Sequence, residues 1–434
     1  MKRLNDELKK KIDMINRGEV PKGYKKTKVG IIPEDWEVKK LGETRDMEDK
    51  YSFTGGPFGS DLKTEHYTSN GVRVLQLQNI GDGNFINDYK IYTSNKKADE
   101  LYSCNIFPGE ILIAKMAEPL ARACIVPDSE ERYLMASDGI RLKVNSDKYI
   151  TKYILECINS NYFRNKAIKK GTGTTRLRIG LGELAKIKLA IAKKEEQQKI
   201  AQILSTWDEA IELKEKLLEE KKKQKEGVMQ KLLTGKIRLP GFNGEWKKVK
   251  LKNTGVIVTG TTPSTKIKEY YENGVYPWVT PTDITEKKYI SKTERYLTYK
   301  GLKVGRFLPA GSLLVTCIAS IGKNAILTTD GSCNQQINAI LPSKNHSNEF
   351  LYYLISYRVD YIKSYAGTSA TQIINKSTFE NLKFFIPSLP EQKAIAKVLS
   401  TADREIYLLT QELEQLKLQK KGLMQLLLTG IVRV

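Results

Sequence analysis

The sequence is poor in the residues that most often carry catalysis or cross-link a fold. It contains only two histidines, His66 and His346, so general acid–base catalysis by histidine is poorly supplied. Its cysteines are scattered, odd in number and without a Cys-x-x-Cys pair: Cys104, Cys124, Cys157, Cys317 and Cys333. This pattern gives neither a disulfide framework nor a zinc-binding spacing, so we expect the cysteines to be buried as small apolar residues.

Motifs for the chemistry of nucleic-acid enzymes are also missing. No Pro-Pro pair occurs, although an adenine methyltransferase holds its flipped base with an Asn/Asp-Pro-Pro-aromatic segment, and no GxxxxGK[ST] phosphate loop is present. The segment FTGGPFGS at Phe53 has Pro57 where a cofactor loop needs its last glycine, so it is either a DNA-facing loop or a simple turn. The fragment Glu37-x-Lys39 has its carboxylates too close in sequence for the usual nuclease site. We expect no active site, metal or cofactor in this chain.

Long apolar runs are absent as well. No stretch approaches the roughly 20 apolar residues of a membrane-spanning helix. The opening MKRLNDELKKKIDMINRG lacks the apolar centre of a secretion signal. We therefore expect a cytoplasmic protein without a membrane partner.

Charge of one sign dominates what is present. The net charge of +22 predicts a polyanionic partner, for which nucleic acid is the first candidate. The excess is uneven, because the segments 196–235 and 391–430 are almost neutral and leave +21 on the other 354 residues. The positive charge therefore belongs to the regions outside these two segments.

The two neutral segments are copies of each other. The stretches EQQKIAQILSTWDEAI from Glu196 and EQKAIAKVLSTADREI from Glu391 align without a gap and run on to GVMQKLLTG and GLMQLLLTG, with 22 of 40 positions identical. Both lack proline and end at Thr-Gly, which is typical of a helix that stops at a left-handed glycine.

An apolar seam with 4-3 spacing runs through each copy and predicts a coiled coil. Nine of ten seam positions are apolar in the second copy and seven of ten in the first, where lysines fill the middle. We predict that the interface is formed by Ile200, Leu204, Trp207, Ile211, Leu218, Leu232, Ile395, Leu399, Ile406, Leu409, Leu413, Leu416 and Leu427. The stems of the seam lysines Lys214, Lys221 and Lys225 can lie over apolar surface of the partner helix.

The connections predict the direction of the two helices. A helix of forty residues is about 60 Å long. The region between the helices has about 140 residues and a diameter of about 35 Å, too short to join the far ends of parallel helices. The helices should therefore be antiparallel.

The basic regions resemble each other weakly. Both open on a tryptophan (DWEVKKLGE at Asp35, EWKKVKLKN at Glu245) and contain an Asn-Gly-Val turn before a strand. Both continue with a Gly-led strand, a short helix, a polar loop and a last strand. We predict an α+β fold in which two homologous α/β domains are separated by two long helices that form an antiparallel coiled coil with pseudo-twofold symmetry. The predicted segments are an N-terminal helix (1–22), a first domain (23–194), a first spacer helix (195–236), a second domain (237–389) and a second spacer helix (390–434).

This organisation resembles the specificity subunit of Type I restriction-modification systems. The residues that carry the resemblance are the EQxxIA...LSTxD start and GxMQxLLTG end of both helices, the opening GYKKTKVGIIPEDWEVKKLGE from Gly23, and the polar loop before each helix. The resemblance implies a DNA-reading subunit whose two target recognition domains each read half of a bipartite, asymmetric site. It also implies partners: double-stranded DNA, two adenine-N6 methyltransferase subunits and the restriction subunits. S-adenosylmethionine, ATP and Mg²⁺ would then be bound by those partners.

Candidate DNA contacts follow from the polar loops and from basic residues near predicted strand ends, because Arg, Lys, Asn and Gln read base edges and Ser, Thr and Lys bind phosphates. The loop at Gly173 and the loop at Ser369 hold equivalent places, and by resemblance they match a GxTQ-like pattern in which Arg176 replaces the glutamine. A structural turn before the last strand is the alternative. The candidates are Lys63, Lys115, Arg122, Thr174, Thr175, Arg176, Lys266, Lys268, Arg306, Lys323, Thr371 and Gln372.

The N-terminal segment carries an apolar stripe at Leu4, Leu8, Ile12 and Ile15. We expect residues 1–20 to dock near Leu423 to Val434 or on a methyltransferase subunit. Two other functions stay open: a scaffold whose basic domains bind RNA or acidic proteins, and the recognition subunit of a Type IIB-like restriction system. Binding that is salt-sensitive but indifferent to sequence would favour the scaffold.

Overall fold

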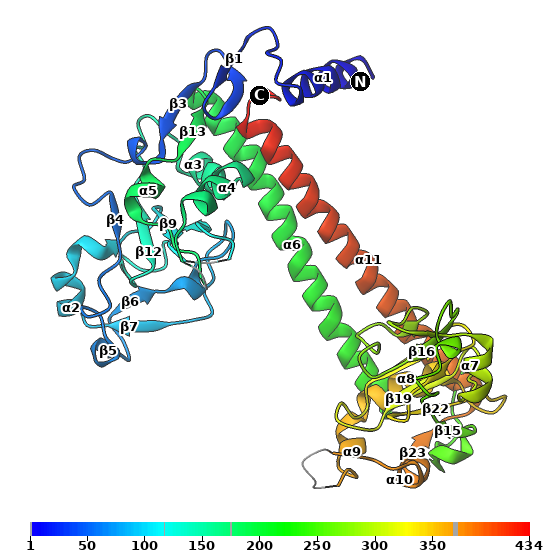
Figure 1. Cartoon of the computed structure of the whole chain (residues 1–434). Helices are drawn as coiled ribbons and strands as arrows, with labels where there is room; N and C mark the ends of the chain where they lie inside the picture. Colours follow the sequence, from blue (N-terminus) through cyan, green and yellow to red (C-terminus); the bar gives the residue numbers. More distant parts are fainter. Residues whose placement is uncertain (1, 117, 174–175, 368–371) are drawn as a thin grey trace. The chain divides into compact units, whose positions relative to one another are not determined.

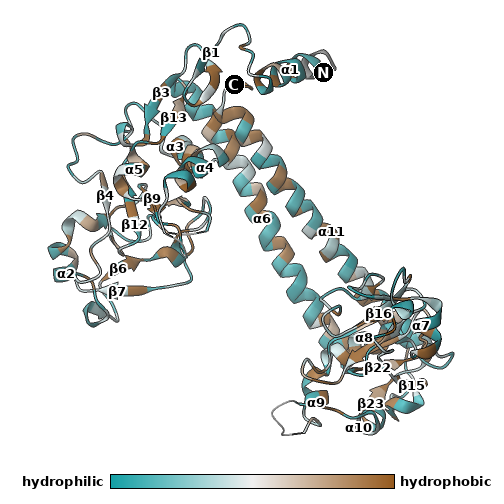
Figure 2. Cartoon of the chain, viewed as in Figure 1, coloured by the Kyte–Doolittle hydropathy of each residue, from teal (hydrophilic) through white to brown (hydrophobic). Residues whose placement is uncertain are grey.

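The computed structural model describes residues 2–116, 118–173, 176–367 and 372–434 (Figure 1). The chain forms two compact units, Met1–Leu213 with Leu413–Val434, and Lys214–Glu412. Each unit therefore contains one domain together with one end of each long helix. Within each unit apolar residues gather in the domain, whereas much of the long-helix surface is polar (Figure 2).

The first unit begins with a helix and builds its domain from short strands. Its elements are α1 (Lys2–Asn16), β1 (Tyr24–Thr27), β2 (Gly30–Pro33), β3 (Glu37–Lys40), β4 (Phe53–Gly55), β5 (Tyr67–Thr68), β6 (Val72–Leu75), β7 (Ile91–Thr93), α2 (Asn95–Glu100), β8 (Asn105–Ile106), β9 (Ile111–Ala114), β10 (Ala123–Ile125), β11 (Tyr133–Met135), β12 (Gly139–Leu142), α3 (Thr151–Asn159), α4 (Asn161–Lys170), α5 (Leu181–Ala185) and β13 (Lys188–Ile191). The long helix α6 (Lys194–Leu233) follows.

The second unit repeats this order. Its elements are β14 (Lys247–Lys250), β15 (Ile257–Thr259), β16 (Tyr276–Val279), β17 (Tyr289–Ile290), β18 (Tyr296–Leu297), α7 (Tyr299–Val304), β19 (Leu313–Thr316), β20 (Asn324–Leu327), β21 (Ser332–Cys333), β22 (Ile337–Ile340), α8 (Asn348–Tyr357), α9 (Val359–Lys363), α10 (Lys376–Asn381) and β23 (Lys383–Ile386). The second long helix is α11 (Leu389–Leu428).

Sheet topology confirms that the domains are repeats. The antiparallel order β4-β12-β9-β10 of the first domain recurs as β15-β22-β19-β20, where β17 adds a parallel strand at the edge. The order β7-β6-β11, with its parallel pair β6 and β11, recurs as β18-β16-β21. The first and last strands of each domain pair as β3 with β13 and β14 with β23. The weak sequence similarity therefore reflects one fold used twice.

Ion pairs within each unit show that the long helices are antiparallel, as predicted. In the second unit Lys214, Lys221 and Lys225 pair with Glu412, Glu405 and Asp403 at 2.8, 2.7 and 2.5 Å. Residue numbers rise on α6 while they fall on α11. In the first unit Lys420 pairs with Asp208 and Arg433 pairs with Glu196, so residue numbers again rise on one side and fall on the other. The lysines that interrupt the apolar seam of α6 therefore hold carboxylates of α11.

The predicted seam residues are the covered positions of the helices. Buried side chains include Ile200, Leu204, Leu218, Leu232, Ile395, Leu399, Leu413 and Leu427. The other predicted interface residues are half-buried: Trp207, Ile211, Ile406, Leu409 and Leu416. Both helices end where the sequence predicts, because Gly235 and Gly430 have positive φ values of 68° and 69°.

A buried carboxylate closes the junction between each domain and the helices. In the first unit Glu196, in the first turn of α6, accepts hydrogen bonds from Trp36 Nε1 (2.9 Å) and from Arg433 Nε (2.6 Å). In the second unit Glu391 accepts from Arg238 Nε (2.6 Å) and Nη2 (2.7 Å). We call these two arrangements the junction clamps. Each arginine follows the end of one long helix and binds the first turn of the other, so each clamp needs the antiparallel pairing.

The N-terminal helix docks on the end of the chain, as expected. Lys11 Nζ donates to the carbonyl oxygen of Ile431 (3.3 Å), and the Tyr24 hydroxyl donates to that of Gly430 (2.7 Å). The side chains of Leu8, Ile12 and Ile15 are half-buried. The N-terminal segment therefore contacts the C-terminal residues of the chain within the first unit.

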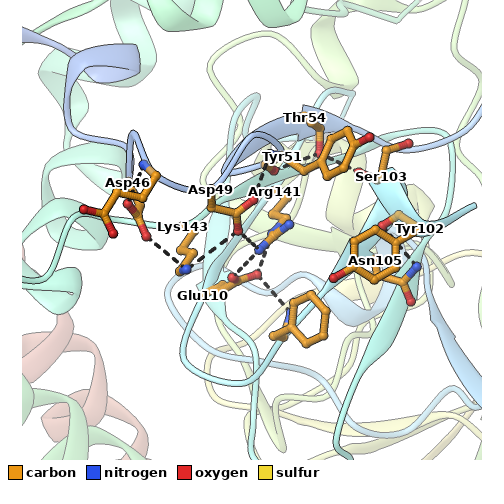
Figure 3. A network of polar contacts seen from close by, with 12 residues as sticks. Asp46, Asp49, Tyr51, Thr54, Tyr102, Ser103, Asn105, Glu110, Arg141 and Lys143 are labelled. Carbon is orange, nitrogen blue, oxygen red and sulfur yellow. Dashed lines mark hydrogen bonds and ion pairs between the residues drawn. The ribbon is translucent and has the colours of Figure 1, made fainter.

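A buried polar network stabilises the first domain (Figure 3). Arg141, on β12, is 3% exposed and donates to Glu110 (2.6 and 2.7 Å) and to Asp49 (2.7 Å). Lys143 adds an ion pair to Asp46 at 3.0 Å. Because Glu110 also accepts from the backbone N–H of Phe107 (2.9 Å), every member has a fixed partner and the network serves the fold.

Loss of a clamp arginine should destabilise the chain unequally in the two units. Arg238→Ala leaves Glu391 buried without its cation, which should cost about 3 kcal/mol. Arg433→Ala should cost less, because Glu196 keeps its bond from Trp36 and Arg433 is the more exposed arginine. Calorimetry of the unfolding transitions measures both, with the exposed Arg404→Ala as control. Equal shifts for Arg238→Ala and Arg404→Ala would contradict the clamp.

Removal of the central carboxylate of the polar network should also be costly. Glu110→Leu leaves the guanidinium of Arg141 buried with Asp49 alone, and we expect a loss of about 3 kcal/mol. Glu65→Leu is the control, because Glu65 is 68% exposed and its ion pair with Lys63 spans 3.8 Å, so its change should stay within about 0.5 kcal/mol. The idea is wrong if denaturant midpoints move alike in both variants.

Candidate nucleic-acid interface

One end of each domain gathers the loops that follow its central strands. In the first unit Gly56 N–H donates to Gly139 O (2.9 Å), Lys115 N–H to Asp138 O (2.8 Å) and Ile179 N–H to Lys115 O (2.9 Å). In the second unit Gly260 bonds Ile337 O (3.1 Å), Cys317 bonds Gln336 O (2.9 Å) and Ile374 bonds Cys317 O (2.9 Å). Equivalent backbone hydrogen bonds therefore build the same loop cluster in both domains.

Glycine is required where two of these loops touch. A Cβ on Gly56 would lie 1.9 Å from the carbonyl oxygen of Ala136, and a Cβ on Gly260 would lie 2.2 Å from that of Asn334. Such distances exclude any side chain. The segment FTGGPFGS therefore contains β4 and a turn that packs closely against the loop after β11.

Two of the predicted DNA-binding residues, Lys115 and Arg122, bond to backbone carbonyl oxygens. Lys115 is half-buried and its Nζ donates to Ser137 O (3.1 Å); burial lowers the pKa of this ammonium, and the charge of Asp138 opposes that shift. Arg122 is half-buried and donates through Nη2 to Leu77 O (2.9 Å) and through Nη1 to Glu118 O (3.2 Å). Both side chains position the loop cluster from within.

The other described candidates lie on the surface. Lys63, Arg176, Lys266, Lys268, Arg306, Lys323 and Gln372 are exposed. Lys268 has only a 3.8 Å ion pair with Glu272, while Arg306 Nε donates to Thr259 O at 3.3 Å. Thr174, Thr175 and Thr371 lie outside the described residues. Their contact with DNA stays a prediction.

The polar loops align one residue away from the match that the motif suggests. Thr172 and Arg178 bridge each other, and Gly367 N–H bonds Ile373 O in the second unit. Since Ile179 and Ile374 also make equivalent bonds, Gln372 corresponds to Leu177. Arg176 therefore does not replace the glutamine, because it precedes Leu177, the residue that corresponds to Gln372. An alignment of GTGTTR with GTSATQ pairs the first glycines, Gly171 and Gly367, whereas the hydrogen bonds place Thr172 opposite Gly367.

The cysteine prediction is confirmed, because all five are free and buried. Burial raises the pKa of the thiols of Cys124 and Cys333 to about 12, which makes them unreactive at neutral pH. Within the described ranges no group of three or more His, Cys, Asp and Glu side chains is arranged to hold a metal ion. No helix among the same residues is long and apolar enough to cross a membrane.

Comparisons with known proteins agree on one family. A family model for the Type I restriction modification DNA specificity domain matches residues 33–222 and again 243–418. A protein of Methanocaldococcus jannaschii named as the MjaX specificity subunit of a type I restriction enzyme is 27% identical over 428 residues, which cover 95% of this chain and 97% of the relative.

Solved structures show the same fold. A chain from a study of complex assembly in the type I R-M system superposes with a TM-score of 0.61 at 15% identity and covers 92% of this chain and 99% of its own length. The Type-I restriction-modification S subunit from M. genitalium gives 0.55 at 16% identity and covers 91% and 96%.

The exposed lysines of the second domain should contribute to DNA affinity through phosphate contacts. Lys266→Gln and Lys268→Gln should each weaken binding to all duplexes alike and lower the slope of log affinity against log salt by about 0.9. Fluorescence anisotropy over a salt series measures both effects. Lys397→Gln, on the neutral helix α11, is the control and should keep the slope. Unchanged slopes for all three variants would show that Lys266 and Lys268 make no phosphate contact.

Proposed function

Because the chain belongs to the Type I restriction-modification specificity family and carries its domain twice, we propose that each domain reads one half of a bipartite, asymmetric DNA site. The chain is then the non-catalytic recognition subunit of a larger complex. The chemistry belongs to the partners: adenine-N6 methyltransferase subunits that use S-adenosylmethionine, and restriction subunits that use ATP and Mg²⁺.

The observation that carries the proposal is one loop cluster built twice on equivalent backbone bonds. A repeated framework with different exposed side chains suits two readers of different sequences. The net charge of +21 outside the helical repeats suits the phosphate backbone that both readers must approach. The two domains therefore supply recognition, and the asymmetry of the site follows from their divergence.

The long helices suit the role of a spacer. Each has 40 residues, which corresponds to about 60 Å of helix. Apolar seam residues and three lysine–carboxylate pairs fix their register within the second unit. We propose that this register sets the number of base pairs between the half-sites.

Equivalent apolar residues on the outer faces of the helices offer two docking points. Leu213 on α6 and Leu408 on α11 stand at corresponding places of the repeat and are 65% and 48% exposed. A repeated surface suits two identical partners related by a pseudo-twofold axis. We propose that one methyltransferase subunit docks at each.

The central experiment is methylation mapping in a methylation-free host that expresses this chain with its methyltransferase. We expect N6-methyladenine in a split motif with a fixed gap, present only when this chain is present. A well-formed complex that leaves no motif would favour a nucleic-acid-binding scaffold instead.

The spacer role predicts how helix length changes the motif. Three heptads inserted at matched places in α6 and α11 add about 32 Å, close to the 34 Å of one DNA turn. Both domains should stay on the same DNA face, and the gap should grow by about nine base pairs. A single inserted heptad adds about 10 Å, turns the second domain away from its half-site and should abolish methylation. A gap that ignores both insertions would contradict the spacer role.

The docking points predict stoichiometry. Leu213→Glu and Leu408→Glu should each remove one methyltransferase subunit, and the double variant should remove both, because a buried unpaired carboxylate opposes association. Native mass spectrometry counts the subunits. Gln415→Glu, exposed on α11, is the control that should keep the full complex.

A further inference from the structure

A cleft of about 330 Å³ opens beside the loop cluster of the first domain. One wall comes from the turn after β4, another from the turn after β6, and a third from Ser137 and Asp138. Lys115 and Arg122 bond to two of these walls, at Ser137 O and Leu77 O. The two candidate cations therefore support this cleft, and two exposed side chains, Phe58 and Gln78, belong to its lining.

Phe58 is the first of these side chains. It is 81% exposed, although the neighbouring Pro57 is buried and Gly56 is pinned against Ala136. A phenyl ring on a fixed turn loses little conformational entropy on binding. It can pack against the C5-methyl group of thymine, which is the apolar feature of the major groove.

Gln78 is the second. It is exposed on a tight turn in which Gln76 N–H donates to Asn79 Oδ1 (3.0 Å) and buried Asn79 donates to Ile86 O and Tyr89 O. Gln76 faces Tyr67, to whose hydroxyl its Nε2 lies at 3.4 Å. The Gln78 amide stands on a rigid base and offers one donor and one acceptor, the pair that adenine N7 and N6 require.

The second domain has the same turns with other side chains. Thr280 N–H donates to Asp283 Oδ2 (2.8 Å), which repeats the Gln76–Asn79 bond and puts Thr282 in the place of Gln78. The Gly260 turn puts Thr262 in the place of Phe58, and Thr262 bonds Gln335 (2.6 Å). The backbone is retained while the outward side chains change from large to small. Such a difference is what two half-site readers need and what a purely structural turn does not.

We propose that this cleft is the base-reading site of the first domain, and that Gln78 and Phe58 specify an A·T pair in its half of the target. Gln78 bonds the adenine edge and Phe58 packs on the thymine methyl group. The inference rests on the proposed function and deepens it, since it assigns sequence reading to residues outside the polar loops. Lys115 and Arg122 are positioning residues that hold the walls.

The test compares the wild-type complex with Gln78→Ala and Phe58→Ala. Methylation mapping first gives the wild-type motif. Binding of the purified complexes is then measured on duplexes in which each base pair of the motif is changed singly. Each variant should lose discrimination at one A·T pair by roughly 5- to 140-fold, which is the value of one good base contact. The half read by the second domain serves as the internal control and should keep its ratios.

The outcomes separate the two levels of the argument. No motif for the wild-type complex defeats the proposed function, and the inference falls with it. A wild-type motif with unchanged ratios in both variants defeats the inference alone. Uniform weakening on every duplex also defeats it, because that result reports a phosphate contact or a damaged fold. Thr282→Val gives a mirror test, whose effect should appear only in the other half-site.

Discussion

The junction clamps are the interactions on which the rest of the structure depends. Each places a carboxylate from the first turn of one helix against an arginine that follows the end of the other. A buried charge left alone costs several kcal/mol, so each carboxylate demands its arginine. Each arginine reaches its carboxylate only when the two helices are antiparallel and each helix ends at its glycine. Domain attachment and helix direction thus have one cause.

The helices reconcile two requirements that usually conflict. A seam of leucine and isoleucine alone would pack against many other apolar helices. Lysines in the seam reduce this promiscuity, because each lysine needs a carboxylate at the matching position along the partner helix. Lys214, Lys221 and Lys225 find theirs on α11, which fixes the register and leaves the spacer almost neutral. Most of the positive charge then lies on the domains, where a polyanion can use it.

Sequence reasoning recovers what periodicity and repetition encode. The seam, the antiparallel direction, the helix stops at Gly235 and Gly430 and the duplicated domain could all be predicted, because each depends on local pattern or chain length. The clamp arginines, the Arg141 network and the backbone roles of Lys115 and Arg122 could not be. Those side chains have partners from segments far away in sequence, and the residue type alone does not show that an arginine or lysine is buried.

The one-residue error in the polar loops arose for the same reason, since only hydrogen bonds on both sides fix the alignment. The outward side chains escape the sequence for the same reason, because an alignment on the Asn-Gly-Val turns puts Gln78 opposite Pro281, one residue before Thr282.

The loop cluster is held by main-chain hydrogen bonds, a close approach at glycine, and the side chains of buried Asn79 and half-buried Asp283, whereas no hydrogen bond of the cluster uses the side chain of Phe58 or Gln78. Substitutions at the outward positions therefore change almost nothing in the folded-state energy. A lineage could drift through new targets one base pair at a time, without compensating changes in the core. Stability and recognition are separable traits in this molecule, and selection on either can proceed with little constraint from the other.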